Sequence, residues 1–145
     1  MTASERAIEL ARAGAAAAAE VKATTIEAID VSDRLIISDV FLIVTGSSEP
    51  QINAIVRTVE NALVDMGAKR LRREGLGYDA GWVLLDYGEL VVHVQGEEEY
   101  EEYALPKLWA GAPKIDLGLT NEELGLGEET DTATPRASLS EPDTV

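Results

Sequence analysis

Apolar residues recur at helical spacing between residues 50 and 66, which is the clearest pattern in the chain. The positions that share this face are Ile52, Ile55, Val56, Val59, Leu63 and Met66. Pro50 suits the first turn of a helix, and Gly67 is a residue type that commonly ends one. Another helix is predicted over residues 4–21, where Ser4 can cap a run rich in alanine.

Shorter apolar stretches predict strands. Residues 40–45 form a continuous apolar run, which is typical of a strand buried on both faces. Residues 82–87 and 90–95 are joined by a tight connection and predict a hairpin. Weak alternation predicts a strand over residues 24–31, and residues 69–73 form a short basic strand or extended segment.

The remaining segments complete the order of elements. Residues 74–81 hold three glycines and predict a loop, whereas residues 97–108 predict a last helix that Pro106 must bend or end early. The order is therefore helix, strand, strand, helix, strand, strand, strand and helix. This order predicts an α/β or α+β domain in which helices flank a mixed β-sheet.

The composition predicts one domain followed by a tail. Hydrophobic residues make up 46% of the chain, which is enough for one core, and we expect the domain to span residues 1–113. Residues 114–145 form an acidic tail that is rich in Glu, Thr, Ser, Pro and Asp. Such a composition predicts disorder, here from about residue 120 onward.

The charge and the absence of cysteine narrow the classes of function. Without cysteine there is no disulfide framework, no thiol nucleophile and no cysteine-bound zinc. A formal net charge of −15 repels phosphate backbones and is compatible with a basic protein partner, although simple solubility is the favoured explanation from charge alone. No apolar run is long enough to cross a bilayer and the N-terminus lacks a secretory pattern, so we expect a cytoplasmic protein without a membrane partner.

One turn offers an enzymatic alternative. Gly46, Ser47 and Ser48 lie between a predicted strand and a helix, where backbone N–H groups can face a phosphate. A nucleotidyltransferase would then need paired acids on the next strand to hold magnesium, and no such pair follows. The alternative is a phosphate-handling enzyme that uses this turn with Asp39 and Asp86, but a structural turn is the favoured interpretation.

No cofactor or metal site is predicted. His93 is the only histidine, and a single histidine cannot build a metal site without acidic helpers. We expect a partly buried, hydrogen-bonded side chain instead. The basic residues Lys69, Arg70, Arg72 and Arg73 can contact a nucleic-acid backbone or pair with the acids of residues 97–99, and solvated charges on a strand are the favoured interpretation.

Three stretches taken together resemble the Iojap, or ribosomal silencing factor (RsfS), family. The first is residues 39–48 with Gln51, Ala54 and Ile55; the second is Glu74 and Gly75 with residues 81–88; the third is residues 91–94 with Glu98, Tyr103, Leu105, Leu108 and Trp109. They follow the order and spacing of the family and span residues 5–109. Two positions depart from it: Tyr100 stands where the family usually has arginine, and Pro106 where it usually has an acid.

The resemblance implies a nucleotidyltransferase-like fold and a translational repressor that is not an enzyme. Members of this family bind the large ribosomal subunit at its fourteenth protein, sterically block the joining of the small subunit, and often form homodimers. Carried onto this chain, the contact surface is Trp82, Asp86, Tyr87, Gly88, Glu74 and Gly75. By position alone, Trp82 fits the core or an interface, and Tyr87 is expected to be exposed at the hairpin tip.

Overall fold

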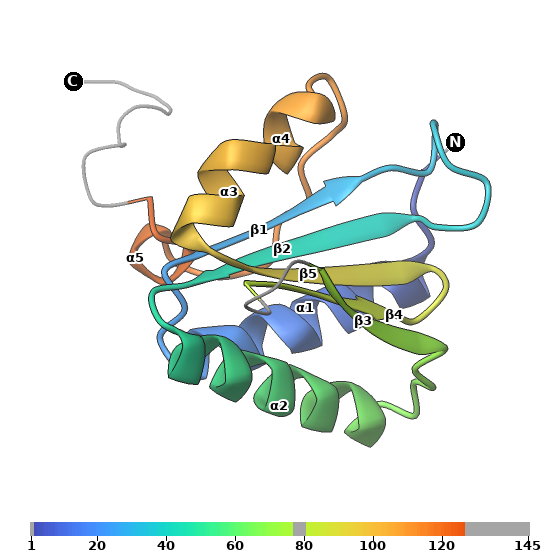
Figure 1. Ribbon diagram of the computed structural model, residues 1–145. Coiled ribbons are helices and arrows are strands. Elements are labelled where there is room, and N and C mark those ends of the chain that lie inside the picture. The colour runs from blue at the N-terminus through green and yellow to red at the C-terminus, as the bar shows by residue number, and fades with distance from the viewer. Residues whose placement is uncertain (1, 77–80, 127–145) are drawn as a thin grey trace.

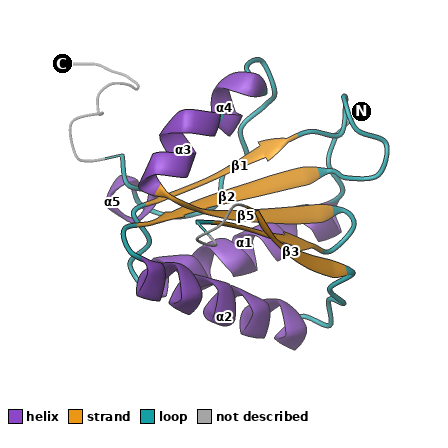
Figure 2. Cartoon of the chain, in the orientation of Figure 1, coloured by secondary structure: helices purple, strands orange, loops and turns teal. Residues whose placement is uncertain are grey.

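A mixed five-stranded sheet forms the centre of the protein, with helices on both faces (Figure 1; Figure 2). The computed structural model describes residues 2–76 and 81–126. The strands are β1 (Thr25–Asp30), β2 (Val40–Gly46), β3 (Arg72–Leu76), β4 (Trp82–Asp86) and β5 (Leu90–Gly96). Their order is β1-β2-β5-β4-β3; β2 and β5 run parallel, and the other neighbours are antiparallel. The predicted mixed sheet and hairpin are confirmed.

Two long helices, α1 (Glu5–Glu20) and α2 (Glu49–Asp65), cover one face of the sheet, which we call the inner face. Serine side chains cap both helices: Ser4 accepts the N–H of Ala7, and Ser48 accepts the N–H of Gln51. The small residues of α1 allow a close approach, because a Cβ on Gly14 would lie 3.0 Å from Leu42 Cδ2. Both helices begin and end within one residue of their predicted positions.

The opposite face, which we call the outer face, is only partly covered. Helices α3 (Glu97–Tyr103) and α4 (Leu105–Leu108) lie over it (Figure 1). The single helix predicted for residues 97–108 is broken at Ala104, whose φ of 46° is left-handed. Pro106 then lies in the first turn of α4, the place in a helix where proline is tolerated.

Strand β3 lies three residues later than the basic stretch that we expected to form it. Glu74 and Gly75 therefore belong to a strand, not to the predicted loop. Arg72 pairs with Asp86, and Gly75 pairs with Val83, so the position of β3 is set by backbone pairing with β4. Residues 77–80 of the expected loop lie outside the described residues.

The packed chain continues past residue 113, where we expected the domain to end. Asp30 N–H donates to Pro113 O (2.8 Å), and Ile115 N–H donates to Ala28 O (2.9 Å), so this segment pairs with the free edge of β1. Leu117 is buried in the inner-face core, and a short helix, α5 (Asn121–Leu124), follows. Disorder was expected from residue 120 onward, but residues 120–126 are described and include α5, which Thr120 caps. The rest of that expectation, over residues 127–145, lies outside the described residues.

Hydrogen bonds to three acidic side chains, Asp30, Asp39 and Glu89, attach the N-terminal residues to the sheet. One carboxylate oxygen of Asp30 accepts a hydrogen bond from the N–H of Ala3 (2.9 Å). The other oxygen accepts hydrogen bonds from both the N–H and the hydroxyl of Ser32. Asp39 accepts the N–H of Ser4, whose hydroxyl donates to Glu89. Burial alone would raise the pKa of Asp30, but the hydrogen bonds from Ser32 and Ala3 outweigh it and lower the pKa below 3.8.

Replacement of a fully buried leucine tests the inner-face core. Leu42→Ala should lower the free energy of unfolding by about 2–5 kcal/mol, because it removes buried methyl groups and leaves a cavity. Urea denaturation measures the loss. Leu71→Ala, the same substitution at an exposed position, should change stability by less than about 0.5 kcal/mol. Equal losses in the two variants would contradict the assignment of this core.

Asp30→Asn tests the carboxylate that fastens the N-terminus. Asparagine has one acceptor oxygen where Asp30 uses two, so the variant should be less stable than the wild type at neutral pH. Because the pKa of Asp30 is lowered in the folded state, its contribution is present above pH 3.8 and is lost as the pH falls through the folded pKa. Urea denaturation across this range should show the two proteins converging at low pH, whereas Asp65→Asn, at an exposed position, should not show this trend.

Candidate functional site

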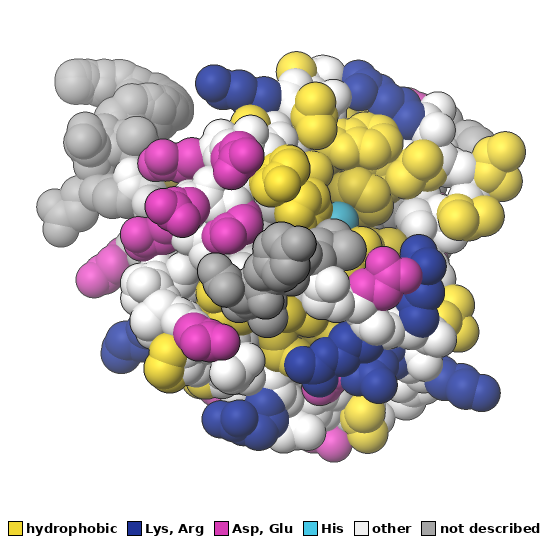
Figure 3. All heavy atoms as spheres, in the orientation of Figure 1, with side chains coloured by type: hydrophobic (Ala, Val, Ile, Leu, Met, Phe, Trp, Pro, Cys, Tyr) yellow, Lys and Arg dark blue, Asp and Glu magenta, His cyan; other side chains and the backbone are white. Residues whose placement is uncertain are grey.

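Aromatic side chains gather on the outer face. Both tryptophans and the only phenylalanine of the chain are among them. The group, which we call the aromatic cluster, consists of Phe41, Trp82, His93, Tyr103 and Trp109. Ring centroids lie 4.7 Å apart for Trp82 and Tyr103, and 4.8 Å apart for Phe41 and His93. Figure 3 shows hydrophobic side chains around the histidine on this side of the molecule.

Strand alternation places these residues together. Phe41 and Ile43 share the outer side of β2, and His93 pairs with Ile43 on one side and Leu84 on the other. Trp82, two residues before Leu84, therefore also faces outward. Its indole Nε1–H donates to His93 Nδ1 at 3.1 Å, so the polar atom of the tryptophan is satisfied within the protein.

The aromatic cluster is open to solvent at its border with α3 and α4. Tyr103 is 47% exposed and Leu108 is 67% exposed, whereas Trp82 and Leu84 are half-buried. Trp and Tyr are enriched at the energetic centres of protein interfaces. The outer face therefore has the composition of a protein-docking surface.

Charged groups border this surface on two sides. Glu97, Glu98, Glu101 and Glu102 are exposed on α3. Figure 3 shows acidic side chains gathered beside the hydrophobic area. At the other side, on β3, Arg72 lies between Glu74 (2.8 Å) and Asp86 (3.3 Å). Arg70 and Arg73 pair with Glu60 of α2, so the acids of residues 97–99 are not the partners of these arginines.

The structure brings three of the residues implied by the family resemblance to the outer face. Trp82 and Asp86 lie on the same side of β4, and the pairing of Glu74 with Leu84 places Glu74 on that side of β3. They do not form one compact group, because Trp82 begins the strand and Asp86 ends it. The other four cluster members were not predicted as site residues; they are Phe41, His93, Tyr103 and Trp109.

The expectation that Tyr87 is exposed is wrong. Its side chain is only 8% exposed and packs in the inner-face core. Alternation from Val83 and Leu85 turns residue 87 toward α2, and burial, with a contribution from the negative charge of Glu60, raises the pKa of its hydroxyl. The adjacent Gly88 has a φ of +87° in the turn, a conformation that suits glycine.

Gly75 likewise does not contribute to the outer face. It pairs with Val83, whose side chain is buried on the inner face, and its position in β3 has open space around it. Asp86 Oδ1 accepts the N–H of Gly88 at 2.8 Å, so the turn residues of the hairpin support one another. Tyr87, Gly88 and Gly75 therefore shape the strands that carry the outer face.

The residues of the enzymatic alternative do not meet. Ser48 caps α2, and Ser47 donates both its N–H and its hydroxyl to Gln51 Oε1. Asp39 lies just before β2, and Asp86 pairs with Val91 near the start of β5, so both acids lie at one end of the sheet. The turn of residues 46–48 lies at the opposite end, where β2 ends. The seven-residue strand between them spans roughly 20 Å. The favoured interpretation, a structural turn, agrees with this geometry.

His93 is a structural, hydrogen-bonded side chain, as predicted. Its Nδ1 accepts from Trp82, and burial lowers its pKa to about 4, so the imidazole is neutral at physiological pH. Within residues 2–76 and 81–126, no group of three His, Asp or Glu side chains could hold a metal ion. In the same part of the chain, no helix has the length and apolar character needed to cross a bilayer.

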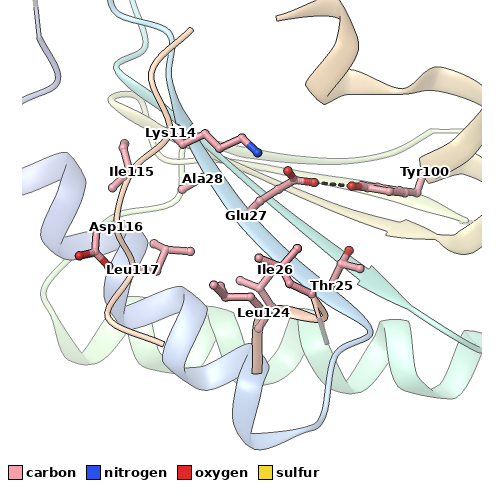
Figure 4. A pocket seen from close by; sticks show the side chains of 11 residues that line it. Thr25, Ile26, Glu27, Ala28, Tyr100, Lys114, Ile115, Asp116, Leu117 and Leu124 are labelled. Carbon is pink, nitrogen blue, oxygen red and sulfur yellow. Dashed lines mark hydrogen bonds between the residues drawn. The ribbon is translucent and has the colours of Figure 1, made fainter. Parts of the chain in front are cut away.

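A separate pocket of about 160 Å³ lies between β1 and the C-terminal segment (Figure 4). Its walls are mainly apolar, with Ile26, Ala28, Leu117 and Leu124 among them. At one side Tyr100 of α3 donates its hydroxyl to Glu27 of β1 at 2.5 Å. Burial and this carboxylate raise the pKa of Tyr100, so the hydroxyl stays protonated and ties α3 to the edge of the sheet.

Comparison with known proteins identifies the family. A family model described as "Ribosomal silencing factor during starvation" matches residues 4–141. The ribosomal silencing factor RsfS of Bacillus subtilis is 39% identical over 71% of this chain and 86% of its own length. The RsfS of Halalkalibacterium halodurans is 37% identical over 75% of this chain and 92% of its own length.

Solved structures agree with the fold. A crystal structure of a Chromobacterium violaceum protein matches with a TM-score of 0.66 and 28% identity, over 71% of this chain and 85% of that one. A Bacillus halodurans structure matches with a TM-score of 0.62 and 35% identity, over 74% of this chain and 97% of that one. Because the family model spans nearly the whole sequence and these relatives match along most of their own length, the chain belongs to the ribosomal silencing factor family.

Proposed function

We propose that this chain is a translational repressor that docks through its outer face on a protein of the large ribosomal subunit. Membership of the ribosomal silencing factor family and the printed names of its relatives support a role in silencing ribosomes. The observation that carries the docking surface is the partly exposed aromatic cluster beside the acidic helix α3. The family resemblance gives the partner as the fourteenth protein of the large subunit.

The proposed contact surface joins residues from two sources. Trp82, Glu74 and Asp86 come from the family resemblance and share the outer face. Leu84 and Tyr103 are added because they are half-buried or exposed beside Trp82, and Leu108 because it is exposed on α4, which lies over the same face. Tyr87, Gly88 and Gly75, also implied by the resemblance, act in this proposal by holding the strands in place. The apolar centre would supply affinity, and the surrounding acids would steer approach to a basic partner.

Occlusion needs no chemistry at the docking site. A folded domain that covers the intersubunit side of the large subunit would prevent the small subunit from joining, and translation would fall. The basic residues 69–73 at the β3 edge would add a minor contact with ribosomal RNA. Such a factor acts in the cytoplasm, where ribosomal subunits assemble.

A homodimer of the free protein is a further part of this proposal, as the resemblance implies. A second copy would cover the exposed Tyr103 and Leu108, which otherwise face water. If the dimer and the ribosomal complex use the same surface, large subunits should convert the dimer into bound monomer. Analytical ultracentrifugation with and without isolated large subunits follows this exchange.

The direct test of the function uses isolated subunits. The full-length protein should co-sediment with large subunits but not with small ones, and large subunits loaded with it should form fewer joined ribosomes. Failure to bind large subunits would overturn the proposed function. Binding without any effect on joining would overturn the mechanism of occlusion.

Trp82→Ala should weaken binding to large subunits by about tenfold to thirtyfold, because a half-buried tryptophan at an interface centre contributes about 2 kcal/mol. Co-sedimentation across a concentration series measures the dissociation constant, and circular dichroism checks that the variant remains folded. Val64→Ala removes an exposed apolar side chain from α2, away from the outer face, and should bind as the wild type does. Unchanged binding by folded Trp82→Ala protein would show that the contact surface is misplaced.

The acids of α3 should act on the rate of association. The double variant Glu98→Gln and Glu102→Gln should associate more slowly with large subunits and show a weaker dependence on salt, because two charges facing a basic partner are removed. Stopped-flow mixing at low and high ionic strength measures both effects. The control variant Glu9→Gln with Glu20→Gln removes the same amount of charge from α1. If it slows association equally, the effect comes from the net charge of the protein and not from α3.

A further inference from the structure

In the part of the chain that the structure describes, three polar side-chain atoms on β5 are buried and have no hydrogen-bond partner. They are His93 Nε2, Gln95 Nε2 and Gln95 Oε1. His93 is 5% exposed and Gln95 is 0% exposed. Both side chains point to the outer side of the same strand, two residues apart. Buried polar groups are nearly always paired in folded proteins, so three unpaired atoms in one place need an explanation.

Helix α3 passes over these two residues. Tyr100 reaches Glu27 on β1, and the ring of Tyr103 packs at a tilt against Trp82 of β4. Strands β2 and β5 lie between β1 and β4, and α3 contacts both of them. Across the sheet, Glu27 pairs with Ile43, which in turn pairs with His93. Gln95 pairs with Trp82 on the neighbouring strand. The helix therefore crosses the outer side of the strands that carry His93 and Gln95.

Few interactions hold α3 in this position. None of its seven residues is buried, and its N-cap, Gly96, makes no side-chain hydrogen bond. Its C-cap, Ala104, has a left-handed φ of 46°, which is unfavourable for a residue with a Cβ. Five of the seven residues are glutamates, whose like charges repel one another. The restraints that α3 itself supplies in the described structure are the contacts of Tyr100 and Tyr103 and the Glu99 carboxylate, which lies against Gly81 and Gly96.

The protonation of His93 determines which chemical groups of a partner could form hydrogen bonds with the residues under α3. Because Trp82 Nε1–H donates to Nδ1, the proton of the neutral imidazole sits on Nε2, which is therefore a donor. Gln95 offers one donor and one acceptor from its amide. A peptide group, or the side-chain amide of asparagine or glutamine, can supply the complementary acceptor and donor atoms.

We propose that α3 is a movable cover, which lifts when the protein docks so that a peptide or side-chain amide of a basic partner protein bonds His93 and Gln95. This inference rests on the proposed function and names the chemistry that the partner brings to the outer face. The negative charge of the chain and of α3 favours a basic protein over RNA, whose phosphates α3 would repel. Lifting α3 also uncovers the part of Trp82 against which Tyr103 packs, so the apolar contact and the polar contacts become available together.

A covalent tether tests whether the cover must move. The chain has no cysteine, so Glu27→Cys with Tyr100→Cys introduces the only reactive pair. Without a linker, this variant has lost its tether and should bind large subunits at least as tightly as the wild type. After reaction with a short bismaleimide, which is verified by mass spectrometry, it should bind at least tenfold more weakly, because α3 can no longer leave the sheet. Equal binding by the linked and unlinked forms would overturn the proposal.

The matched control carries the same linker where α3 is not restrained. Arg6→Cys with Met66→Cys replaces another pair in which a long side chain bridges two elements, since Arg6 Nη2 donates to Met66 O. Linking α1 to the end of α2 should leave binding unchanged. If this control also loses binding, the linker itself is harmful and the effect on α3 is refuted. If even the wild type fails to bind, the proposed function fails, and that result differs from failure of the cover alone.

Gln95→Leu provides a second readout that a purely structural residue would not give. Leucine has a similar size and no polar atoms, so the free protein should become more resistant to urea. Binding to large subunits should nevertheless weaken about tenfold, because the partner's amide would lose its hydrogen bonds. A variant that is more stable and binds as tightly as the wild type would show that the partner does not use Gln95.

Discussion

The parallel pairing of β2 with β5 is the constraint on which both faces of the sheet depend. Its register aligns Leu42 with Val92 and Ile43 with His93. A slip of one residue would turn every side chain of one strand to the opposite face. The inner-face side chains of that strand would then turn to the outer face, and a slip of β5 would bring His93 into the core against α1 and α2. Register, more than any single contact, therefore separates the residues that fold the protein from those that are free to bind.

The two faces of the sheet differ in how completely their side chains are covered. The inner face buries branched apolar residues under two long helices, and small residues such as Gly14 and Ala18 bring α1 close to the sheet. The outer face leaves aromatic groups only partly covered and surrounds them with acids. A partly exposed aromatic surface favours self-association, and a strongly negative charge opposes it in solution. The acidic composition is thus compatible with both solubility and recognition of a basic partner.

The sequence predicted the elements that are defined by interactions between residues close together in the chain. The apolar spacing of residues 52–66 and the caps Ser4 and Ser48 were sufficient to place α1 and α2. The position of β3 and the attachment of residues 113–115 to β1 were not predicted, because backbone hydrogen bonds to distant strands fix them and leave no periodic pattern. Tyr87 was misjudged because its place near a hairpin tip was given more weight than the alternation that continues from Leu85.

The site was harder to predict than the fold, because its members come from four separate segments. The family resemblance supplied Trp82, but Phe41 and Tyr103 join it only through strand register and the path of α3. One available signal was the scarcity of aromatics, since the chain has two tryptophans and one phenylalanine; the strand register is still needed to assign Phe41 and Trp82 to the same face. The unpaired atoms of Gln95 could not be predicted, because satisfaction of a buried amide depends on every neighbour in three dimensions.

The charge of α3 connects recognition with the movement proposed for this helix. Five glutamates in seven residues repel one another, and no basic residue of the helix offsets them. A basic partner would reduce this repulsion and would attract α3 toward itself, away from the sheet. The same field that speeds the encounter would therefore lower the cost of uncovering His93 and Gln95. A neutral or acidic surface could do neither, so the charge of the helix would select the partner at both steps of docking.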